Sequence, residues 1–147
     1  MQMFLGRHHT TIDAQNRLAP PPKLSDLFTK VAFLTQGFDK NLVLMTDEAF
    51  KEMLAHIKTL NIADPITRLL LRMILGNTVE VQTDTAGRLI VPDHLKEFAG
   101  LTHKVFLIGQ GDYYEVWSPE SWEKQEIRIL DAEANASRFS VLNIATS

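Results

Sequence analysis

Hydrophobic and polar positions alternate along the chain in a pattern that predicts two similar series of strands and helices. In the first series, residues 4–13 mix polar with β-branched residues, which is typical of a half-exposed strand. Residues 16–19 resume an extended conformation after a turn. Residues 31–37 and 41–46 are rich in β-forming side chains and are separated by Phe-Asp-Lys, so they are predicted to pair as a hairpin.

Helical periodicity predicts three helices around these strands. Residues 20–28 begin with prolines, which suit the first turn of a helix, and continue with leucines on one face. A second helix begins at acidic residues and covers 47–60, with apolar residues at amphipathic spacing. A third, over 64–75, has an Asp-Pro start and a glycine after its last turn, both of which are typical helix boundaries.

The second series repeats this order. Strands are predicted over 77–84 and 87–92, a short helix over 93–100 closed by Gly100, and a hairpin from 103–111 and 113–118. Ser118 and Pro119 form a good cap and first-turn pair for a closing helix.

One motif, Asp-x-x-x-Arg-Leu-x-x-Pro-x-x-Leu, occurs once in each series. Its members are Asp13, Arg17, Leu18, Pro21 and Leu24 in the first copy and Asp84, Arg88, Leu89, Pro92 and Leu95 in the second. Each residue of the first copy lies 71 positions before its counterpart, as Asp13 does before Asp84. A constant offset indicates duplicated supersecondary structure.

The repeat therefore predicts an α+β fold of two tandem β-β-α-β-β-α halves. The first half covers residues 3–60 and the second half covers 77–130. A connecting helix is expected within 61–76. The tail, 131–147, is weakly patterned and is predicted to be either a frayed helix or disordered.

Composition is that of an ordinary globular protein. The chain has 147 residues, of which 45% are hydrophobic and 22% charged, so it is long enough to bury a core in one domain or two intertwined halves. It has no cysteine, which excludes disulfides and thiolate metal sites. No apolar run is long enough for a signal peptide or a membrane helix, so we expect a cytoplasmic protein without membrane association.

The charge is unevenly distributed. A net charge of −3 argues mildly against nucleic-acid binding. Residues 1–30, however, carry four Lys or Arg residues against two aspartates, so this segment is net positive. The distribution of charge governs local binding more than the sum does.

The residue types of the repeated motif suit a tight turn between strands. Asp13 and Asp84 are expected to accept backbone N–H groups, while Asn16 and Gly87 tolerate a positive φ. The aspartate is also placed to orient the arginine four residues later through a bidentate contact. The alternative is that each Asp–Arg pair is purely a structural staple.

These motifs resemble the MraZ family of transcriptional regulators, whose halves each carry a SpoVT/AbrB-type DNA-binding module. The resemblance rests on a Met-Phe-x-Gly start, both copies of the Asp–Arg motif, and the segments 106–111 and 115–117, and it covers nearly all of residues 3–130. The resemblance implies a pseudo-symmetric swapped-hairpin β-barrel with flanking helices, made within one chain, and assembly of several chains into a ring.

The resemblance also implies the function and its residues. Members bind repeated G-rich elements of double-stranded promoter DNA at the division and cell-wall gene cluster, which places the protein at the nucleoid. Arg17 and Arg88 are expected to enter the major groove, and Arg7 and Lys23 are candidates for phosphate contacts. Gln15 stands where the family usually has Lys, and Asn16 stands where it usually has Gly.

Two other classes of function compete with DNA binding. An enzyme is disfavoured because no metal-binding spacing, glycine-rich phosphate loop or nucleophile elbow is present, and His8 and His9 on one strand would point to opposite faces. No catalytic residue, metal or cofactor is therefore assigned. An antitoxin-like or scaffold role in protein binding on the same fold remains the alternative.

Overall fold

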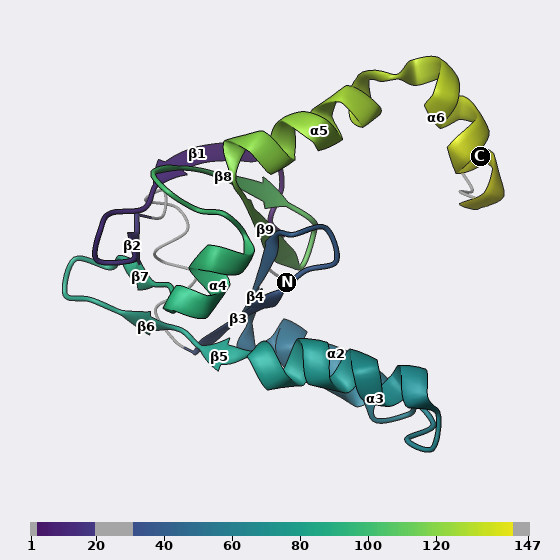
Figure 1. The fold of residues 1–147 in the computed structure, drawn as a ribbon, viewed down its shortest axis with the longest axis horizontal. Coiled ribbons are helices and arrows are strands. Elements are labelled where there is room, and N and C mark those ends of the chain that lie inside the picture. Colours follow the sequence, from purple (N-terminus) through teal and green to yellow (C-terminus); the bar gives the residue numbers. More distant parts are fainter. Residues whose placement is uncertain (1–2, 20–30, 143–147) are drawn as a thin grey trace.

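A computed structural model describes residues 3–19 and 31–142 (Figure 1). The helix predicted over 20–28, together with Pro21, Lys23 and Leu24, lies outside these described residues. The described strands are β1 (Arg7–Thr11), β2 (Arg17–Leu18), β3 (Ala32–Gln36), β4 (Leu42–Thr46), β5 (Val79–Glu80), β6 (Gln82–Thr83), β7 (Leu89–Ile90), β8 (Lys104–Gly109) and β9 (Tyr113–Trp117). The helices are α2 (Asp47–Ile57), α3 (Pro65–Ile74), α4 (Asp93–Phe98), α5 (Pro119–Leu130) and α6 (Ala132–Phe139), with 3-10 turns η1 (Leu75–Asn77) and η2 (Ser140–Leu142).

The larger sheet has the strand order β1-β8-β9-β4-β3-β5, and its described pairings are antiparallel. Its central pair, β4 with β9, joins the hairpins of the two halves. At each edge, the first strand of one half pairs with the hairpin of the other, since β1 pairs with β8 and β5 pairs with β3. Three pairs of strands are equivalent in the repeat: β1 with β5, β3 with β8, and β4 with β9. The members of each pair occupy equivalent places counted from opposite edges of the sheet, so the sheet has an internal pseudo-two-fold arrangement.

A smaller sheet has the order β2-β7-β6. Its two short strands β2 and β7 pair across the halves, with Arg17 opposite Ile90 and Leu18 opposite Leu89, and Arg88 directly precedes β7. The α+β class is thus confirmed, with mixed helices and antiparallel strands. The closed swapped-hairpin barrel stays a prediction.

The single strand predicted over 77–84 is wrong. The chain forms β5 in the larger sheet and β6 in the smaller one, and Val81 lies between them with its N–H donated to the carbonyl oxygen of Ala32 at 2.8 Å. Local alternation of residues cannot reveal this break, because both pieces are extended and differ only in the strand that each one pairs with.

Buried aliphatic side chains from both halves form one core between the sheets and α4. The most completely buried include Leu42, Leu44, Leu95, Leu107, Val105 and Val116. Burial of one such side chain stabilises a fold by roughly 1.5–3 kcal/mol. Because β4, β8 and β9 all contribute to this core, the two halves cannot be separated without exposing it.

The helices begin where the sequence predicts. Asp64 caps α3 by accepting the N–H of Ile66 at 2.9 Å, and Ser118 caps α5 by accepting the N–H of Ser121 at 3.2 Å. Within the tail, residues 132–139 form α6, which Asp131 caps by accepting the N–H of Ala134. The α2–α3 pair and the α5–α6 pair project from the sheets as two separate arms (Figure 1).

Candidate nucleic-acid interface

The first Asp–Arg motif folds into a tight turn between β1 and β2. Asp13 Oδ1 accepts the backbone N–H groups of Gln15 and Arg17, both at 2.9 Å. The Asp13 N–H also donates to the carbonyl oxygen of Arg17 at 3.0 Å, and the Asn16 N–H donates to that of Asp13 at 3.1 Å. Asn16 has a φ of 64°. Asparagine is among the residues that tolerate this left-handed conformation.

The second motif builds the same turn between β6 and β7. Asp84 Oδ1 accepts the N–H groups of Ala86 and Arg88, both at 2.9 Å, and Gly87 has a φ of 79°. The Asp84 N–H donates to the carbonyl oxygen of Arg88 at 2.9 Å. Both turns lie at the end of the molecule opposite the two helical arms, on the left in Figure 1.

The two turns are linked by ion pairs that cross between the halves. Arg17 Nη1 lies 3.7 Å from Asp84 Oδ2, and Arg88 Nη1 lies 3.7 Å from Asp13 Oδ2. Each arginine also reaches its own aspartate, Arg88 Nε at 2.8 Å and Arg17 Nε at 4.0 Å. We expected each guanidinium to make a bidentate contact with the aspartate of its own turn. Each one instead contacts both aspartates, and these shared contacts hold the two arginines side by side.

The surroundings of both aspartates lower the pKa of their carboxyl groups. The backbone N–H of Arg17 is the main group that lowers the pKa of Asp13, and the backbone N–H of Arg88 does the same for the pKa of Asp84. The positive charges of Arg17 and Arg88 lower the pKa of Asp13 further, and the charge of Arg88 lowers the pKa of Asp84, while desolvation opposes both shifts. The carboxylates are thus fixed acceptors at neutral pH.

The arginine side chains are accessible in part. Their exposed fractions are 31% for Arg17 and 37% for Arg88. Gln15, next to Arg17, accepts a hydrogen bond from the Arg17 guanidinium. Each guanidinium has five N–H donors, and the contacts above leave some of them available for an incoming ligand.

Two side chains reach the first turn from α4 and were not anticipated from the sequence. Asp93 and Lys96 both contact the side-chain amide of Asn16, Lys96 Nζ at 2.9 Å from Asn16 Oδ1. They are separated from Asn16 by 77 and 80 residues. No local pattern could connect positions so far apart in the chain.

Arg7, a predicted phosphate contact, lies near α5. Its guanidinium is 3.1 Å from Glu126 Oε1 and 5.2 Å from the centre of the Trp122 ring. Arg7 precedes Asp13 by six residues and begins the extended strand β1, so it can lie up to about 20 Å from the turn. Lys23, the other predicted phosphate contact, lies outside the described residues.

Comparison with known proteins identifies the family. The MraZ family model, described as "MraZ protein, putative antitoxin-like", matches residues 74–141. The transcriptional regulator MraZ of Thermomicrobium roseum is 33% identical over 141 residues, which are 95% of this chain and 99% of that protein. The chain belongs to the MraZ family.

Other MraZ proteins are similar to the same extent. The transcriptional regulator MraZ of a Roseiflexus species is 34% identical over 94% of both chains. That of Mycoplasma mobile is 35% identical over 93% of both chains. The resemblance noted from the motifs is thus confirmed over both halves, and the relatives are named as transcriptional regulators.

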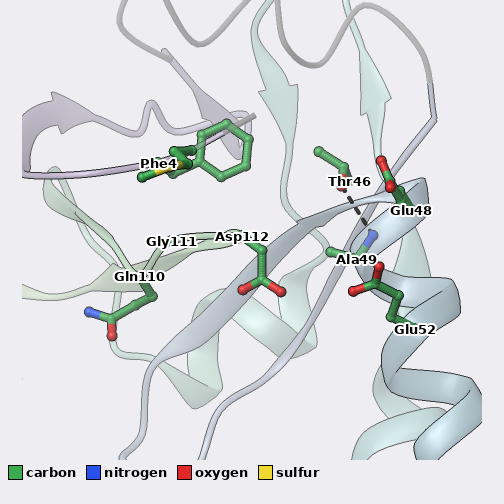
Figure 2. A pocket seen from close by; sticks show the side chains of 9 residues that line it. Phe4, Thr46, Glu48, Ala49, Glu52, Gln110, Gly111 and Asp112 are labelled. Carbon is green, nitrogen blue, oxygen red and sulfur yellow. Dashed lines mark hydrogen bonds between the residues drawn. The ribbon is translucent and has the colours of Figure 1, made fainter. Parts of the chain in front are cut away.

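A pocket of about 630 Å³ lies elsewhere on this MraZ chain, between the N-terminal segment, the β8–β9 loop and the start of α2. Figure 2 shows Glu48, Glu52 and Asp112 on its walls, where Thr46 caps α2 by accepting the Ala49 N–H at 3.2 Å. Among the described residues, no Lys or Arg lines this pocket. Its acidic walls would repel phosphate, so it is not part of the candidate interface.

Within residues 3–19 and 31–142, no cluster of three His, Asp or Glu side chains converges as a metal site, and no helix is long and apolar enough to cross a membrane. His8 packs edge-on against Tyr114, and His9 packs edge-on against Phe106.

Proposed function

We propose that this MraZ chain binds promoter DNA sequence-specifically and regulates transcription of the division and cell-wall gene cluster. Arg17 and Arg88 read guanines of repeated G-rich elements in the major groove. The observation that carries this proposal is the pair of identical Asp–Arg turns, held side by side by ion pairs across the halves. Two adjacent arginines on rigid turns can contact neighbouring bases at the same time.

The chemistry of the pair suits guanine. A guanidinium can donate two parallel hydrogen bonds to O6 and N7 of guanine, which discriminates against other bases by roughly 1–3 kcal/mol. Asp13 and Asp84 fix the turns and aim the arginines without contacting DNA, because carboxylates close to phosphates are repelled. Arg7 and Lys23 contribute phosphate contacts, which position the protein without specifying sequence.

Assembly multiplies this small discrimination. We propose that each chain forms one pseudo-symmetric swapped-hairpin barrel and that several chains close into a ring. The two arms expose large apolar side chains: Leu60, Ile62, Ile66 and Leu69 on one, and Ile127, Ile129, Leu130, Phe139, Val141 and Leu142 on the other. Two different apolar surfaces on one chain favour head-to-tail contact, which closes into a ring when the rotation allows. A ring presents many turns to repeated elements at high effective concentration.

Because it binds DNA, we propose that the protein is located in the cytoplasm and associates with the nucleoid. The net charge of −3 is not an obstacle, because the arginine turns form one small end of the molecule.

The decisive experiment measures binding of a fluorescent duplex that carries the DNA upstream of the protein's own gene, over a range of salt concentrations. We expect Arg17→Ala and Arg88→Ala to abolish preference for this duplex over a scrambled one. Circular dichroism and light scattering should show an unchanged fold and assembly. Arg17→Lys should not restore the preference, because Lys lacks the planar fork of donors.

The alternative is a protein-binding, antitoxin-like or scaffold role, which agrees with the antitoxin-like description of the family. In that case the parent chain would show no preference for its upstream DNA and no steep decrease of affinity with salt. If both alanine variants bind the duplex as the parent does, the motif is a structural staple and the reading surface lies elsewhere.

A further inference from the structure

The first turn receives a cation from the opposite half of the chain. Lys96 Nζ lies 2.9 Å from Asn16 Oδ1, and Asn16 directly precedes Arg17. Lys96 lies on α4, whose Leu95 is fully buried in the core. The backbone of Lys96 is therefore fixed relative to the sheets, and its ammonium group is held next to the turn.

Asn16 is the residue that holds this ammonium group. Its Nδ2 donates to Asp93 while its Oδ1 accepts from Lys96. Because a carboxylate only accepts and an ammonium only donates, this orientation of the amide satisfies both neighbours and the reversed one would satisfy neither. The Asn16 carbonyl oxygen also accepts the N–H of Val91 at 2.8 Å, which ties the turn to the segment before α4.

Among residues 3–19 and 31–142, no side chain makes an equivalent contact with the second turn. Gly87 occupies the position of Asn16 and has no side chain to engage a neighbour, and Ala86 occupies the position of Gln15. The two turns thus share a backbone conformation but differ in the groups that surround their arginines.

The ammonium group of Lys96, beside the first turn, is not neutralised by an ion pair among the described residues. Lys96 is half-buried. Asn16 is a neutral acceptor and occupies one of the three ammonium N–H donors, and within the described part of the chain the other two have no hydrogen-bond partner.

We propose that Lys96 contacts a DNA phosphate beside the base that Arg17 reads, and that Asn16 is the positioning residue for this contact. This inference rests on the proposed function. Lys96 supplies to the first turn the cation that Gln15 does not provide, and it does so from the other half of the chain. A phosphate contact of this kind fixes the register of the protein on the duplex.

The test measures affinity for the upstream duplex and for a scrambled duplex as a function of salt. We expect Lys96→Met to weaken binding to both duplexes several-fold and to lower the slope of log affinity against log salt by about 0.9 per chain bound. Lys124→Met, which removes the same charge from an exposed site on α5, should leave affinity and slope as in the parent. Thermal unfolding checks that both variants are folded.

A second variant separates charge from position. Asn16→Gly keeps a residue that tolerates the positive φ and keeps Lys96, so we expect a parent-like slope with weaker affinity. When Asn16 is already glycine, Lys96→Met should reduce the affinity for DNA by a smaller factor than it does in the parent.

Each remaining outcome overturns the inference. If Arg88→Ala loses sequence preference while Lys96→Met has the parent's affinity and slope, the proposed function stands and Lys96 is not a phosphate contact. If Lys96→Met lowers only the melting temperature, its role is to stabilise the turn. A parent chain that binds neither duplex overturns both the inference and the proposed function.

Discussion

At the scale of single residues, Asp13 and Asp84 use their two carboxylate oxygens for different tasks. In each, Oδ1 accepts two backbone N–H groups of the turn, while Oδ2 faces the guanidinium groups. One side chain therefore couples the shape of the turn to the aim of the arginine. This coupling explains how a short motif can specify both a fold element and a binding group.

The two tasks predict different effects of two substitutions at Asp84. Asp84→Asn retains an oxygen that can accept the turn N–H groups but removes the charge that faces both arginines. We expect a small decrease in melting temperature, since the ionised carboxylate contributes to stability, together with weaker sequence preference in DNA binding. Asp84→Ala removes both functions, so the melting temperature should decrease further, by a few degrees. Equal melting temperatures for the two variants would contradict this division of tasks.

The same residues predict how stability depends on pH. The folded-state pKa values of Asp13 and Asp84 lie below the unfolded value of 3.8. Their contribution to stability is therefore present above pH 3.8 and is lost as the pH decreases through the lower folded-state values. In acid titrations followed by circular dichroism, Asp84→Asn should lose less stability below this pH than the parent does.

At the scale of elements, the N-terminal segment is fastened to the β8–β9 hairpin by backbone contacts. The Gly109 N–H donates to the carbonyl oxygen of Gly6 at 2.8 Å, and Phe4 and Gly111 exchange hydrogen bonds at 2.7 and 2.9 Å. A Cβ atom on Gly109 would lie 2.5 Å from the backbone of Leu5. The glycine at 109 is thus required by the close approach of two backbones.

We predict that Gly109→Ala destabilises the fold by roughly 1–3 kcal/mol, because backbone must shift to admit the methyl group. Gly76→Ala is the matched control, since nothing lies within 4 Å of its Cβ position. That control should be neutral or stabilise the protein by up to about 1 kcal/mol. Urea denaturation measures both, and equal stabilities would refute the close approach.

At the scale of the whole molecule, the two arms are the surfaces that the fold leaves uncovered. Ile66 on α3 is 74% exposed and Leu130 on α5 is 72% exposed. Exposed apolar surface of this extent usually marks a site of association. The opposite end, with the arginine turns, is then free to face DNA.

We predict that Ile66→Glu and Leu130→Glu each reduce the size of the assembly in solution, because a buried interface would have to accommodate a charge. Gln125→Glu adds the same charge on α5 without removing an exposed apolar side chain, so it should assemble like the parent. Light scattering at micromolar concentration measures all of these proteins. A monomeric parent, or variants with the parent's mass, would contradict the proposed ring.

Much of the local structure was determined by the sequence alone. The alternation of residues predicted the hairpins that became β3–β4 and β8–β9, and the starts of α3 and α5 were predicted from Asp64 and Ser118. These features depend on groups only a few residues apart, so local sequence patterns are enough to predict them. The repeated motif likewise indicated two equivalent units and, through its resemblance, the family.

The tertiary structure alone decided which distant segments meet. It divided residues 77–84 between two sheets, paired the first strand of each half with the hairpin of the other, and ordered α6 beyond Asp131. It also brought Asp84 to Arg17 and Lys96 to Asn16. The two side-chain contacts join residues 67 and 80 positions apart. Such contacts arise because both halves bury their apolar faces in one core. The packing of this core fixes the positions of the polar side chains on the same strands and helices. Local sequence patterns do not predict those positions.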